Sequence, residues 1–378
     1  MKIEQINLVN FRNYRDLKLN ISGSVNVFYG NNAQGKTNLL ESIFYAAFGL
    51  SHRTGNEEDL VGMGRAEMAA EVCFSNYAGE HSLKVKRRNN AEKNKKEVML
   101  NGNVIKSREH YGTFNVVMFS PEDLQLVKGE PALRRRFLDM EIAQTNRSYY
   151  ANLVKYNRIV QQRNKLLKEA RENGINEKLI EVWDEELASG AAAIMVTRIR
   201  VLQKINELAG DVYKEIASRK EELVVNYELK TNSSALILSE EKSREEWRNW
   251  YLESLKERRA ADIARGSTGI GPHRDDLVLT VNEDNLKSFG SQGQQRSSAL
   301  ALKLAEMEYV KEETGEYPVL LLDDVMSELD SERRRQILHF IDGRVQTFIT
   351  VNDKNLIPVL PENKYFRVHN GIVCEEKA

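Results

Sequence analysis

The chain has 378 residues, of which 41% are hydrophobic and 29% are charged, and its formal net charge at pH 7 is −1. This length predicts about two domains with a substantial core, and the balanced charge excludes nucleic-acid binding through overall basicity, so that only local basic clusters can support it. Two cysteines, Cys73 and Cys374, fit neither a disulfide framework nor a cysteine metal cluster. The N-terminus lacks an apolar signal segment and no apolar run approaches the length of a membrane span, so we expect a soluble cytoplasmic protein without a membrane partner.

The N-terminal segment combines strands with a glycine-rich loop. Residues 2–9, 17–21 and 25–29 have the pattern of strands, and residues 38–48 have apolar positions at helical spacing. Between the third strand and this helix, residues 30–37 read G-x-x-x-x-G-K-T. Glycines allow backbone N–H groups to surround a polyphosphate at the positive end of a helix, while the lysine reaches the β- and γ-phosphates and the threonine binds Mg²⁺. The segment therefore predicts a nucleotide site.

Short strands are predicted next, at residues 68–74, 81–86 and 97–100, followed by the hairpin signal Asn101-Gly102. We expect an antiparallel β lobe inserted after the first α/β unit. The link from residue 84 to residue 96 is strongly basic. Its basic residues are Lys84, Lys86, Arg87, Arg88, Lys93, Lys95 and Lys96. They form either a solvated hairpin tip or a surface that contacts a phosphate backbone, and both interpretations stay open.

The centre of the chain is mainly helical. After an apolar strand at residues 113–119, Ser120-Pro121 is typical of a helix start because proline fits the first turn. Residues 131–220 are nearly all helix formers with apolar stripes, and Asn173-Gly174 interrupts them. This pattern predicts an antiparallel pair of helices in a compact second lobe.

The C-terminal part alternates strands and helices. Strands are expected at residues 223–229, 276–281, 317–323, 346–351, 364–369 and 371–374, and helices at residues 243–265, 292–314 and 331–341. The run 318–322 is apolar throughout, as in a parallel sheet buried on both faces, and two carboxylates follow it, Asp323 and Asp324. Because such sheets bind ligands at the carboxyl ends of their strands, we expect Asp323 to hold Mg²⁺ and Asp324 to polarise the attacking water.

Two further motifs separate the families of phosphate-loop proteins. Ser291-Gln292-Gly293-Gln294 opens the helix before the Asp-Asp strand, where a hydroxyl and backbone N–H groups can face an anion. In isolation this is an ordinary helix cap. In this position it resembles the signature motif of ATP-binding-cassette (ABC) ATPases, through which a partner subunit contacts the γ-phosphate, and Ser327-Glu328-Leu329-Asp330 resembles their D-loop. The chain thus holds two half-sites, as expected if two copies enclose two ATP molecules.

Together, residues 10–14, 30–38, 268–276 and 291–295 resemble the RecF family of bacterial recombination mediators, which is related to Rad50 and the SMC proteins. The resemblance runs from Met1 to the last strands. It implies an α/β fold, in which an ABC-type ATPase head carries an inserted antiparallel β lobe and a helical second domain. We therefore expect an ATPase domain at 1–130 and 266–378 and a helical arm domain at 131–265.

The resemblance also implies a function. ATP and Mg²⁺ are the expected cofactors, and an ATP-dependent homodimer is expected to clamp double-stranded DNA near single-strand gaps and junctions. The expected enzyme is a weak, DNA-stimulated ATPase that acts as a switch in recombinational DNA repair, replication and the SOS response to DNA damage. RecR and RecO are the expected partners, and the pathway leads to RecA loading.

The resemblance also implies roles for individual residues, according to their positions in the motifs. The resemblance makes Lys36, Ser291 and Asp324 catalytic, and it gives Mg²⁺ to Thr37 and Asp323. The nucleotide-binding residues that it implies are Arg12, Asn13, Gly30, Asn31, Asn32, Ala33, Gln34, Gly35, Lys36, Thr37, Asn38, Arg53, Ser291, Gly293, Gln294 and Asp330. Asp324 stands where many ABC ATPases have glutamate, and a shorter carboxylate holds water less closely, which predicts slow hydrolysis.

Two positions depart from the superfamily or align with it loosely. Either Glu122 or Gln125 occupies the place of the Q-loop residue that senses Mg²⁺. Residues 350–353, Thr-Val-Asn-Asp, stand where a switch histidine is common, so the γ-phosphate sensor stays open. The turn at residues 271–274 predicts a rigid basic loop in which His273 is a structural hydrogen-bonding residue.

Three basic segments are candidate DNA contacts, each equally compatible with a solvated face or an ion-pair network. They are the link at 84–96, with Lys84, Lys86, Arg87, Arg88 and Lys93; Lys128 with Arg134, Arg135 and Arg136; and Arg333, Arg334 and Arg335. A transporter-type ABC ATPase subunit is the alternative function, but the long helical insertion and the Ser-Gln-Gly-Gln-Gln signature argue against it. A nucleotide or small-molecule kinase would leave the signature and the D-loop unexplained.

Overall fold

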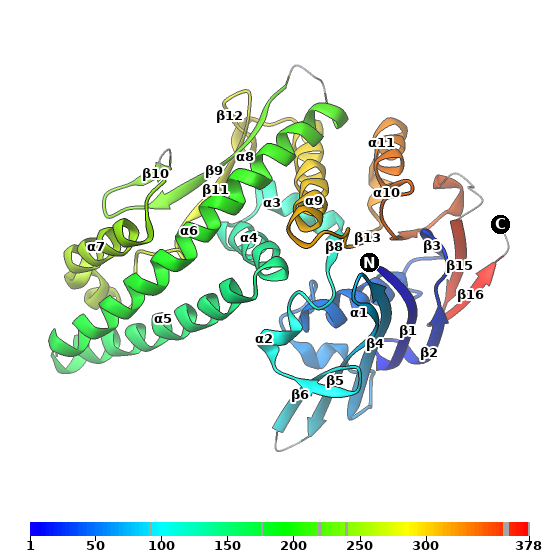
Figure 1. The fold of residues 1–378 in the computed structure, drawn as a ribbon, viewed down its shortest axis with the longest axis horizontal. Coiled ribbons are helices and arrows are strands. Elements are labelled where there is room, and N and C mark those ends of the chain that lie inside the picture. Colours follow the sequence, from blue (N-terminus) through cyan, green and yellow to red (C-terminus); the bar gives the residue numbers. More distant parts are fainter. Residues whose placement is uncertain (91–92, 175–176, 218–220, 239–240, 358–362, 377–378) are drawn as a thin grey trace. The chain divides into compact units, whose positions relative to one another are not determined.

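The computed structural model describes residues 1–90, 93–174, 177–217, 221–238, 241–357 and 363–376, without the side chains of 89–90, 93–95, 173 and 177 (Figure 1). The chain forms two compact units. The first comprises residues 1–123 and 306–378, and the second comprises residues 124–305. Among the described residues, no helix combines the length and the apolar character needed to cross a bilayer.

An antiparallel sheet of the first unit has the strand order β2-β1-β4-β5-β6-β7. Its strands are β1 (Lys2–Phe11), β2 (Tyr14–Asn20), β4 (Glu67–Asn76), β5 (Gly79–Asn90), β6 (Lys93–Leu100) and β7 (Asn103–Ile105). The hairpin between β6 and β7 is the predicted one, since Asn101 and Gly102 both have positive φ, 50° and 81°. The predicted β lobe is therefore not separate: β4 pairs with β1 and continues the sheet that β1 and β2 begin.

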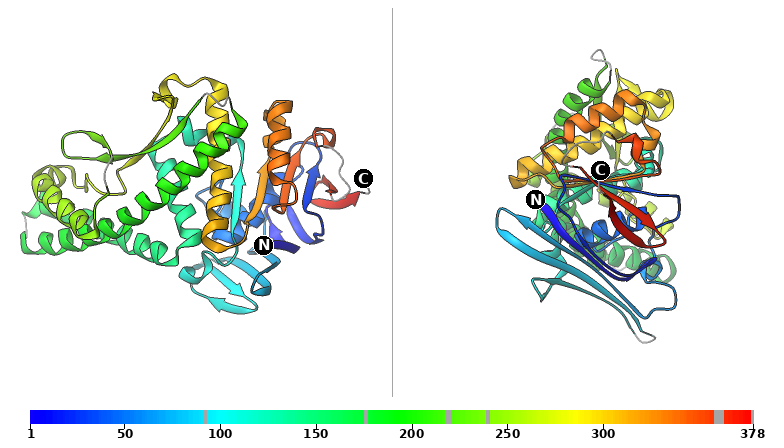
Figure 2. Two further views of the ribbon diagram at one scale, coloured as in Figure 1. Left: turned by 45° about the horizontal axis from the view of Figure 1, so that its top comes forward. Right: turned by 90° about the vertical axis from the view of Figure 1, so that its right-hand side faces the viewer.

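The basic segment 84–96 is corrected from a link to a strand pair, because β5 runs to Asn90 and β6 begins at Lys93. Leu83, Val85 and Arg87 face the interior along β5, whereas Lys84, Lys86 and Arg88 alternate with them on the other face. Strand alternation therefore divides this cluster between two environments. Figure 2 shows these blue and cyan strands from two further directions.

A second sheet of the first unit has the order β16-β15-β3-β14-β13-β8. Its strands are β3 (Val25–Tyr29), β8 (Val116–Phe119), β13 (Val319–Asp323), β14 (Thr347–Val351), β15 (Asn363–His369) and β16 (Ile372–Glu376). All neighbours are parallel except β15 and β16. Every residue of β8, β13 and β14 is buried, which confirms the apolar run as a central strand. Because β14 lies between β3 and β13, the carboxyl ends of these three strands meet at one edge.

Helices and turns of the first unit follow these strands. They are α1 (Lys36–Phe48), η1 (Glu57–Leu60), α2 (Ser107–His110), η2 (Pro121–Leu124), α10 (Val325–Glu328), α11 (Ser331–Ile341) and η3 (Lys354–Leu356). The predicted helix start at Ser120-Pro121 is a 3₁₀ turn, in which the Asp123 carboxylate accepts a hydrogen bond from the Ser120 N–H at 2.7 Å.

The second unit contains long helices and a four-stranded antiparallel sheet of order β10-β9-β11-β12. The helices are α3 (Gln125–Lys128), α4 (Pro131–Thr145), α5 (Arg147–Asn173), α6 (Glu177–Ile216), α7 (Arg244–Arg265), α8 (Leu286–Phe289) and α9 (Gln292–Thr314), which continues into the first unit. The strands are β9 (Leu223–Lys230), β10 (Ala235–Ile237), β11 (Asp276–Val281) and β12 (Asp284–Asn285). Helix α6 packs along α5 and α7 (Figure 1), as the predicted break at Asn173-Gly174 requires.

Two features of the second unit differ from the sequence pattern. A further break occurs at Asn146, whose side chain accepts the Tyr149 N–H at 2.9 Å and caps α5. Strand β11 pairs with β9, and residues 266–305 belong to the second unit. The functional boundaries at residues 131 and 266 stay a prediction.

The loop before β11 is held by buried arginines. Arg163 donates to Asp262 and to Thr268 at 2.9 Å, and Arg198 donates to the Pro272 carbonyl at 2.7 Å. His273 shares a hydrogen bond of 2.7 Å with the Tyr156 hydroxyl, and burial lowers the pKa of His273 to about 3. His273 is therefore a neutral hydrogen-bonding residue, so it contributes no positive charge to the loop.

Candidate functional site: a phosphate-binding loop beside two carboxylates

The glycines of the loop at residues 30–37 have conformations that other residues rarely adopt. Gly30 has φ 150° and Gly35 has φ 118°. A Cβ on Gly30 would lie 2.4 Å from the Val368 carbonyl oxygen, and a Cβ on Gly35 would lie 2.6 Å from Nδ2 of Asn13. The backbone can therefore follow this path only with glycine at both positions. Gly35 also ends the loop at the start of α1, where helix N–H groups favour an anion.

The Lys36 ammonium lies within the loop. Its Nζ donates to the carbonyl oxygens of Gly30 at 2.6 Å and Asn31 at 2.9 Å, and to Oδ1 of Asn352 at 3.0 Å. Burial lowers the pKa of Lys36, while the charges of Asp324 and Asp323 act in the opposite direction. The loop therefore fixes a cation at the point where phosphate charge is expected.

Asp323 lies at the end of β13 and is connected to α1 and β14. Its Oδ1 accepts hydrogen bonds from the Thr37 hydroxyl at 3.0 Å and from the Thr350 hydroxyl at 2.7 Å. Burial raises the pKa of Asp323, and the two threonine hydrogen bonds and the charge of Arg53 oppose this shift. The carboxylate and the Thr37 hydroxyl are hard oxygen donors next to each other, which is the donor chemistry that Mg²⁺ prefers.

Asp324 has a strained backbone beside this pair. Its φ is 54° and its ψ is 13°, a region that few residues other than glycine occupy. The Thr350 hydroxyl accepts the Asp324 N–H at 2.8 Å, and the Ser327 hydroxyl donates to the Asp324 carboxylate at 2.7 Å. Strain of this kind persists only where the surroundings fix it, and such positions cluster at functional sites.

These groups border one pocket of about 180 Å³. It is lined by Asn32, Ala33, Gly35, Lys36, Thr37, Asn38, Arg53, Asp324, Thr350 and Asn352. Most of the predicted loop residues are thus brought together with Asp324. Thr350 and Asn352 belong to the segment without a switch histidine; Asn352 contacts Lys36 and Thr350 connects both aspartates, so this segment does supply polar groups to the site.

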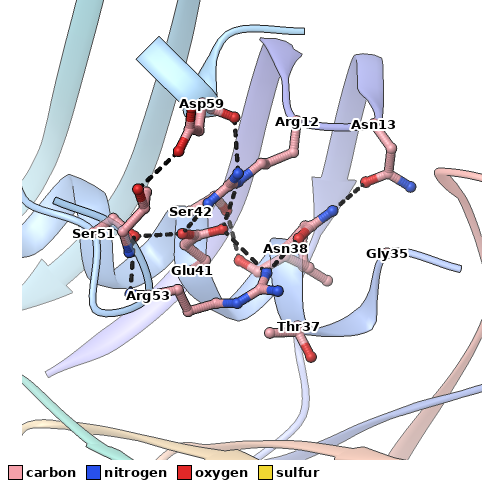
Figure 3. A network of polar contacts seen from close by, with 12 residues as sticks. Arg12, Asn13, Gly35, Thr37, Asn38, Glu41, Ser42, Ser51, Arg53 and Asp59 are labelled. Carbon is pink, nitrogen blue, oxygen red and sulfur yellow. Dashed lines mark hydrogen bonds and ion pairs between the residues drawn. The ribbon is translucent and has the colours of Figure 1, made fainter. Parts of the chain in front are cut away.

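A buried carboxylate organises the far side of the pocket (Figure 3). Glu41 on α1 is fully buried and accepts two hydrogen bonds from Arg12, at 2.9 and 2.8 Å, and one from the Ser51 hydroxyl at 2.5 Å. Arg53, which lines the pocket, donates to Asn38 at 3.0 Å and lies 3.7 Å from Glu41. The Arg12 guanidinium is therefore engaged by the Glu41 carboxylate, whereas the Arg53 side chain lines the pocket.

Asn13 supports the loop from outside. It donates to the Gln34 carbonyl at 3.0 Å and accepts from the Asn38 amide at 2.8 Å. The sequence pattern missed Glu41, because a glutamate in a helix is normally solvent-exposed. Its signal was its place on the apolar side of α1, one residue after Leu40, where a charged group requires a partner such as Arg12.

The two candidates for the Q-loop position, Glu122 and Gln125, lie in different units. Glu122 belongs to the first unit, and its charge raises the pKa of Asp323. Gln125 falls in the second unit and begins α3. Gln125 carries no charge, so this effect does not decide between the two, and the Q-loop residue stays a prediction.

Ser291 and Asp330 both cap helices. The Ser291 Oγ accepts the Gln294 N–H at 3.2 Å, while Gln294 Oε1 accepts the Ser291 N–H at 2.9 Å, a reciprocal capping box at the start of α9. Asp330 Oδ1 accepts the N–H groups of Glu332 and Arg333 at 3.0 and 2.9 Å and caps α11. Ser291 is exposed and Gly293 is half-buried in the second unit, so both remain nucleotide contacts only as predictions.

Two predicted DNA-contacting arginines are buried in ion pairs. Arg87, 9% exposed, donates to Glu57 at 2.8 Å, and Arg134, 4% exposed, makes two bonds of 2.8 Å to Asp276. Arg135 is half-buried and donates to the Asp275 carbonyl at 2.6 Å. The charges of Arg87 and Arg134 are thus compensated within the fold, which corrects the expectation that they face a phosphate backbone.

The other basic residues lie nearer the surface. Lys84 pairs with Glu71 at 3.0 Å and Arg88 pairs with Glu67 at 2.8 Å. Lys86 is half-exposed and Arg136 is exposed. Ion pairs near the surface contribute little to stability, and these four residues stay candidates. The side chain of Lys93 lies outside the described residues.

The parallel sheet carries a phosphate-binding loop after β3 and the carboxylates of Asp323 and Asp324 at the end of β13. Helix α9 begins in the helical unit with the signature-type serine, Ser291, and continues into the first unit. This arrangement defines the protein as an ABC-type ATPase head. The RecF/RecN/SMC N-terminal domain family matches residues 2–371, and the chain belongs to the RecF family.

Relatives and solved structures agree with this assignment. The DNA replication and repair protein RecF of Clostridium perfringens (strain SM101 / Type A) is 42% identical over 374 residues, which cover 98% of this chain and 99% of that protein. RecF of Alkaliphilus oremlandii (strain OhILAs) is 43% identical over 378 residues, with coverages of 98% and 99%. The solved structure of the recombination mediator protein RecF-ATP in the RecFOR pathway has a TM-score of 0.91 at 35% identity, covering 99% of this chain and 97% of that chain. An Smc head domain from Pyrococcus furiosus shares the fold, with a TM-score of 0.55 at 15% identity and coverages of 99% and 95%.

Proposed function

We propose that this protein is an ATP-dependent DNA-binding protein of recombinational repair and replication, in which ATP drives two copies into a clamp on duplex DNA near single-strand gaps. The observation that carries the proposal is the presence in one chain of a phosphate-loop half-site and an exposed signature serine, Ser291, on a helix N-terminus. The names of the RecF relatives support the setting in DNA replication and repair. The ATP-bound RecF structure supports ATP as the ligand.

ATP binding is assigned to the loop of the first unit. Lys36 and the N-terminus of α1 neutralise the polyphosphate, and Arg53 supplies a second cation on the other side of the pocket. Thr37 and Asp323 would hold Mg²⁺, which neutralises charge on the transferred phosphoryl group when it is bound. In the assembled dimer, Ser291 and Asp330 of one copy complete the site formed by the loop of the other copy, a symmetric arrangement in which each interface contains both halves.

Hydrolysis is proposed to be weak and stimulated by DNA, so that it releases the clamp. Asp324 polarises the attacking water, yet its carboxylate already accepts the Ser327 hydroxyl at 2.7 Å. A short side chain with such a partner holds water less closely than a glutamate would, and a slow step suits a switch. RecR and RecO are the proposed partners, since the related solved structures belong to the RecFOR pathway.

DNA contacts are proposed for the surface basic residues Lys84, Lys86, Arg88 and Arg136. Arg87 and Arg134 are omitted because they are buried and their charges are compensated by the carboxylates of Glu57 and Asp276. Phosphate contacts of this kind give affinity that falls steeply with salt. A transporter-type function is not favoured, because the chain belongs to a family whose similar members are named DNA replication and repair proteins.

The test measures how much gapped duplex DNA the protein retains on a filter under three conditions: with ATP·Mg²⁺, with ATP in the absence of Mg²⁺, and without nucleotide. We expect strong retention only with ATP·Mg²⁺ for the wild type. Lys36→Ala is expected to lose it, while Glu4→Ala, an exposed substitution in the same unit, is the matched control. Retention of DNA that is equal with and without ATP would refute an ATP-dependent clamp.

A further inference from the structure

We propose that Glu221 is a positioning residue for the signature serine: it orients Gln294, which in turn fixes the rotamer of Ser291. The inference rests on the proposed function, because it concerns the half-site that a second copy uses. It goes beyond that function by naming a residue outside the motif, on the segment between α6 and β9, that prepares the half-site before ATP binds.

The geometry is a chain of four side chains within the second unit. The Tyr213 hydroxyl donates to Glu221 Oε2 at 2.9 Å, and Gln294 Nε2 donates to Glu221 Oε1, also at 2.9 Å. Gln294 Oε1 accepts the Ser291 N–H at 2.9 Å, and the Gln294 N–H donates to the Ser291 Oγ at 3.2 Å. This series of hydrogen bonds therefore begins at a fully buried tyrosine in the last turns of α6 and ends at an exposed serine at the start of α9.

The two partners of Gln294 determine the orientation of its amide. An N–H group requires the carbonyl oxygen, and a carboxylate requires the NH₂ group, so only one of the two amide orientations satisfies both. A glutamine with one partner can flip, whereas Gln294 cannot flip without losing both hydrogen bonds. The contact to Glu221 is also charge-assisted, which makes it stronger than a neutral hydrogen bond.

The Gln294 side chain acts on Ser291 through the backbone, because its Oε1 holds the Ser291 N–H and with it the position of the serine. Because the Ser291 Oγ accepts the Gln294 N–H, its own hydrogen is free to donate to an acceptor outside α9. Such an acceptor is a phosphate oxygen presented by a second copy. Gln294 accordingly acts through Ser291, since both ends of its amide are engaged within its own unit.

The hydrogen bonds from Tyr213 to Ser291 also connect helix α6 with the signature motif. Tyr213 belongs to α6, which packs along α5 and α7, and its hydroxyl is anchored to the same carboxylate that holds Gln294. A displacement of the end of α6 would therefore be transmitted to Gln294 through Glu221. This gives the helical unit a physical route by which it can change how well Ser291 is presented.

One substitution separates the helix cap from the positioning contact. Gln294→Glu keeps a side-chain oxygen that can accept the Ser291 N–H. It replaces the donor to Glu221 with a second carboxylate, so the positioning contact becomes repulsive and draws this oxygen away from the Ser291 N–H. Glu221→Gln retains an acceptor for Gln294, and the double variant restores an amide–carboxylate pair with the roles exchanged.

The experiment measures mass by light scattering during an ATP·Mg²⁺ titration of the full-length protein, together with the melting temperature without ATP. For Gln294→Glu we expect a lower melting temperature, because two carboxylates replace a hydrogen bond within one unit, and a roughly tenfold higher ATP concentration for half-maximal dimer formation, because Ser291 is then held less firmly. Glu221→Gln replaces the charge-assisted hydrogen bond with a neutral one and is expected to lie between the wild type and Gln294→Glu, whereas the double variant is expected to dimerise like the wild type. Glu222→Gln, an exposed neighbour, is the matched control.

The outcomes distinguish this inference from the proposed function. If the wild type does not dimerise with ATP, the proposed function fails. If the wild type dimerises and Gln294→Glu does so equally well, only the positioning role is refuted. If Gln294→Glu is impaired and the double variant is not rescued, Gln294 acts on the nucleotide without Glu221, which also overturns the inference.

Discussion

Removal of the Glu41 carboxylate is the sharpest perturbation of the first unit. Glu41 is fully buried, and its charge is compensated by the Arg12 guanidinium, which keeps 19% of its side chain exposed. Glu41→Ala leaves that guanidinium without its carboxylate and removes the acceptor of the Ser51 hydroxyl. Breaking a buried ion pair by deleting one partner costs about 3–5 kcal/mol, and the partial exposure of Arg12 places this case near about 3 kcal/mol.

Hydrogen exchange of α1, followed by mass spectrometry, is the assay that reports on this unit alone. We expect the free energy of opening α1 to fall by about 3 kcal/mol in Glu41→Ala, because α1 carries the deleted carboxylate. Since Arg53 and the Ser51 turn are held by the same network, ATP affinity is also expected to fall about tenfold. Glu4→Ala provides the control for loss of an exposed carboxylate.

The result that refutes this reasoning is specific. If Glu41→Ala lowers the opening free energy by less than about 1 kcal/mol, the ion pair with Arg12 is no stronger than an exposed pair, and the network does not stabilise the site. Unchanged ATP affinity with a strongly destabilised α1 would show that Arg53 does not depend on Glu41.

Two further predictions concern pH and the metal. Burial alone would raise the pKa of Glu41, but the hydrogen bonds from Arg12 and Ser51 outweigh it and lower the pKa. The carboxylate therefore stabilises the fold above its unfolded pKa of about 4.3, and this stabilisation is lost as the pH falls through the lower folded pKa. The acid denaturation profile of Glu41→Gln is expected to be flatter than that of the wild type. Thr37→Val removes one hard oxygen donor while keeping the shape of the side chain, so calorimetry is expected to show ATP binding that no longer strengthens when Mg²⁺ is added, and a preserved Mg²⁺ dependence would contradict this metal site.

Much of the fold could be predicted because its signals are local. The strand 25–29, the helices 292–314 and 331–341, and the Asn101-Gly102 hairpin follow from periodicity and from positive-φ turn chemistry. The apolar run before Asp323 predicted a strand with both faces covered, and every residue of β13 is buried. These features depend on neighbours within a few positions of the chain.

The remainder depended on pairing between distant segments. Nothing near residue 276 indicates that β11 pairs with β9, and that pairing places residues 266–305 in the second unit. The same holds for charge: Arg87 and Arg88 are adjacent in the sequence, but strand alternation buries the first against Glu57 and exposes the second. A basic run therefore predicted too many DNA contacts.

The residues of the site divide in the same way, between those that local motifs predict and those whose roles depend on contacts between distant segments. The loop residues and Asp323 were predicted from motifs, because a phosphate-binding loop requires those residue types at that spacing. Glu41 and Asn352 were not, since their roles arise from contacts with Arg12 and Lys36 that only the folded sheet creates. Residues that orient the motifs thus escape a search for the motifs themselves.

The most direct test of the central claim is the ATPase activity of two inactive variants, measured separately and after mixing. Lys36→Ala retains Ser291 but has a damaged loop, and Ser291→Arg retains the loop but blocks the signature. If each site is formed by the loop of one copy and the serine of another, the mixture contains one intact site per mixed dimer, and we expect activity that neither variant has alone. A mixture as inactive as its components, with both variants folded, would contradict a site completed by a second copy.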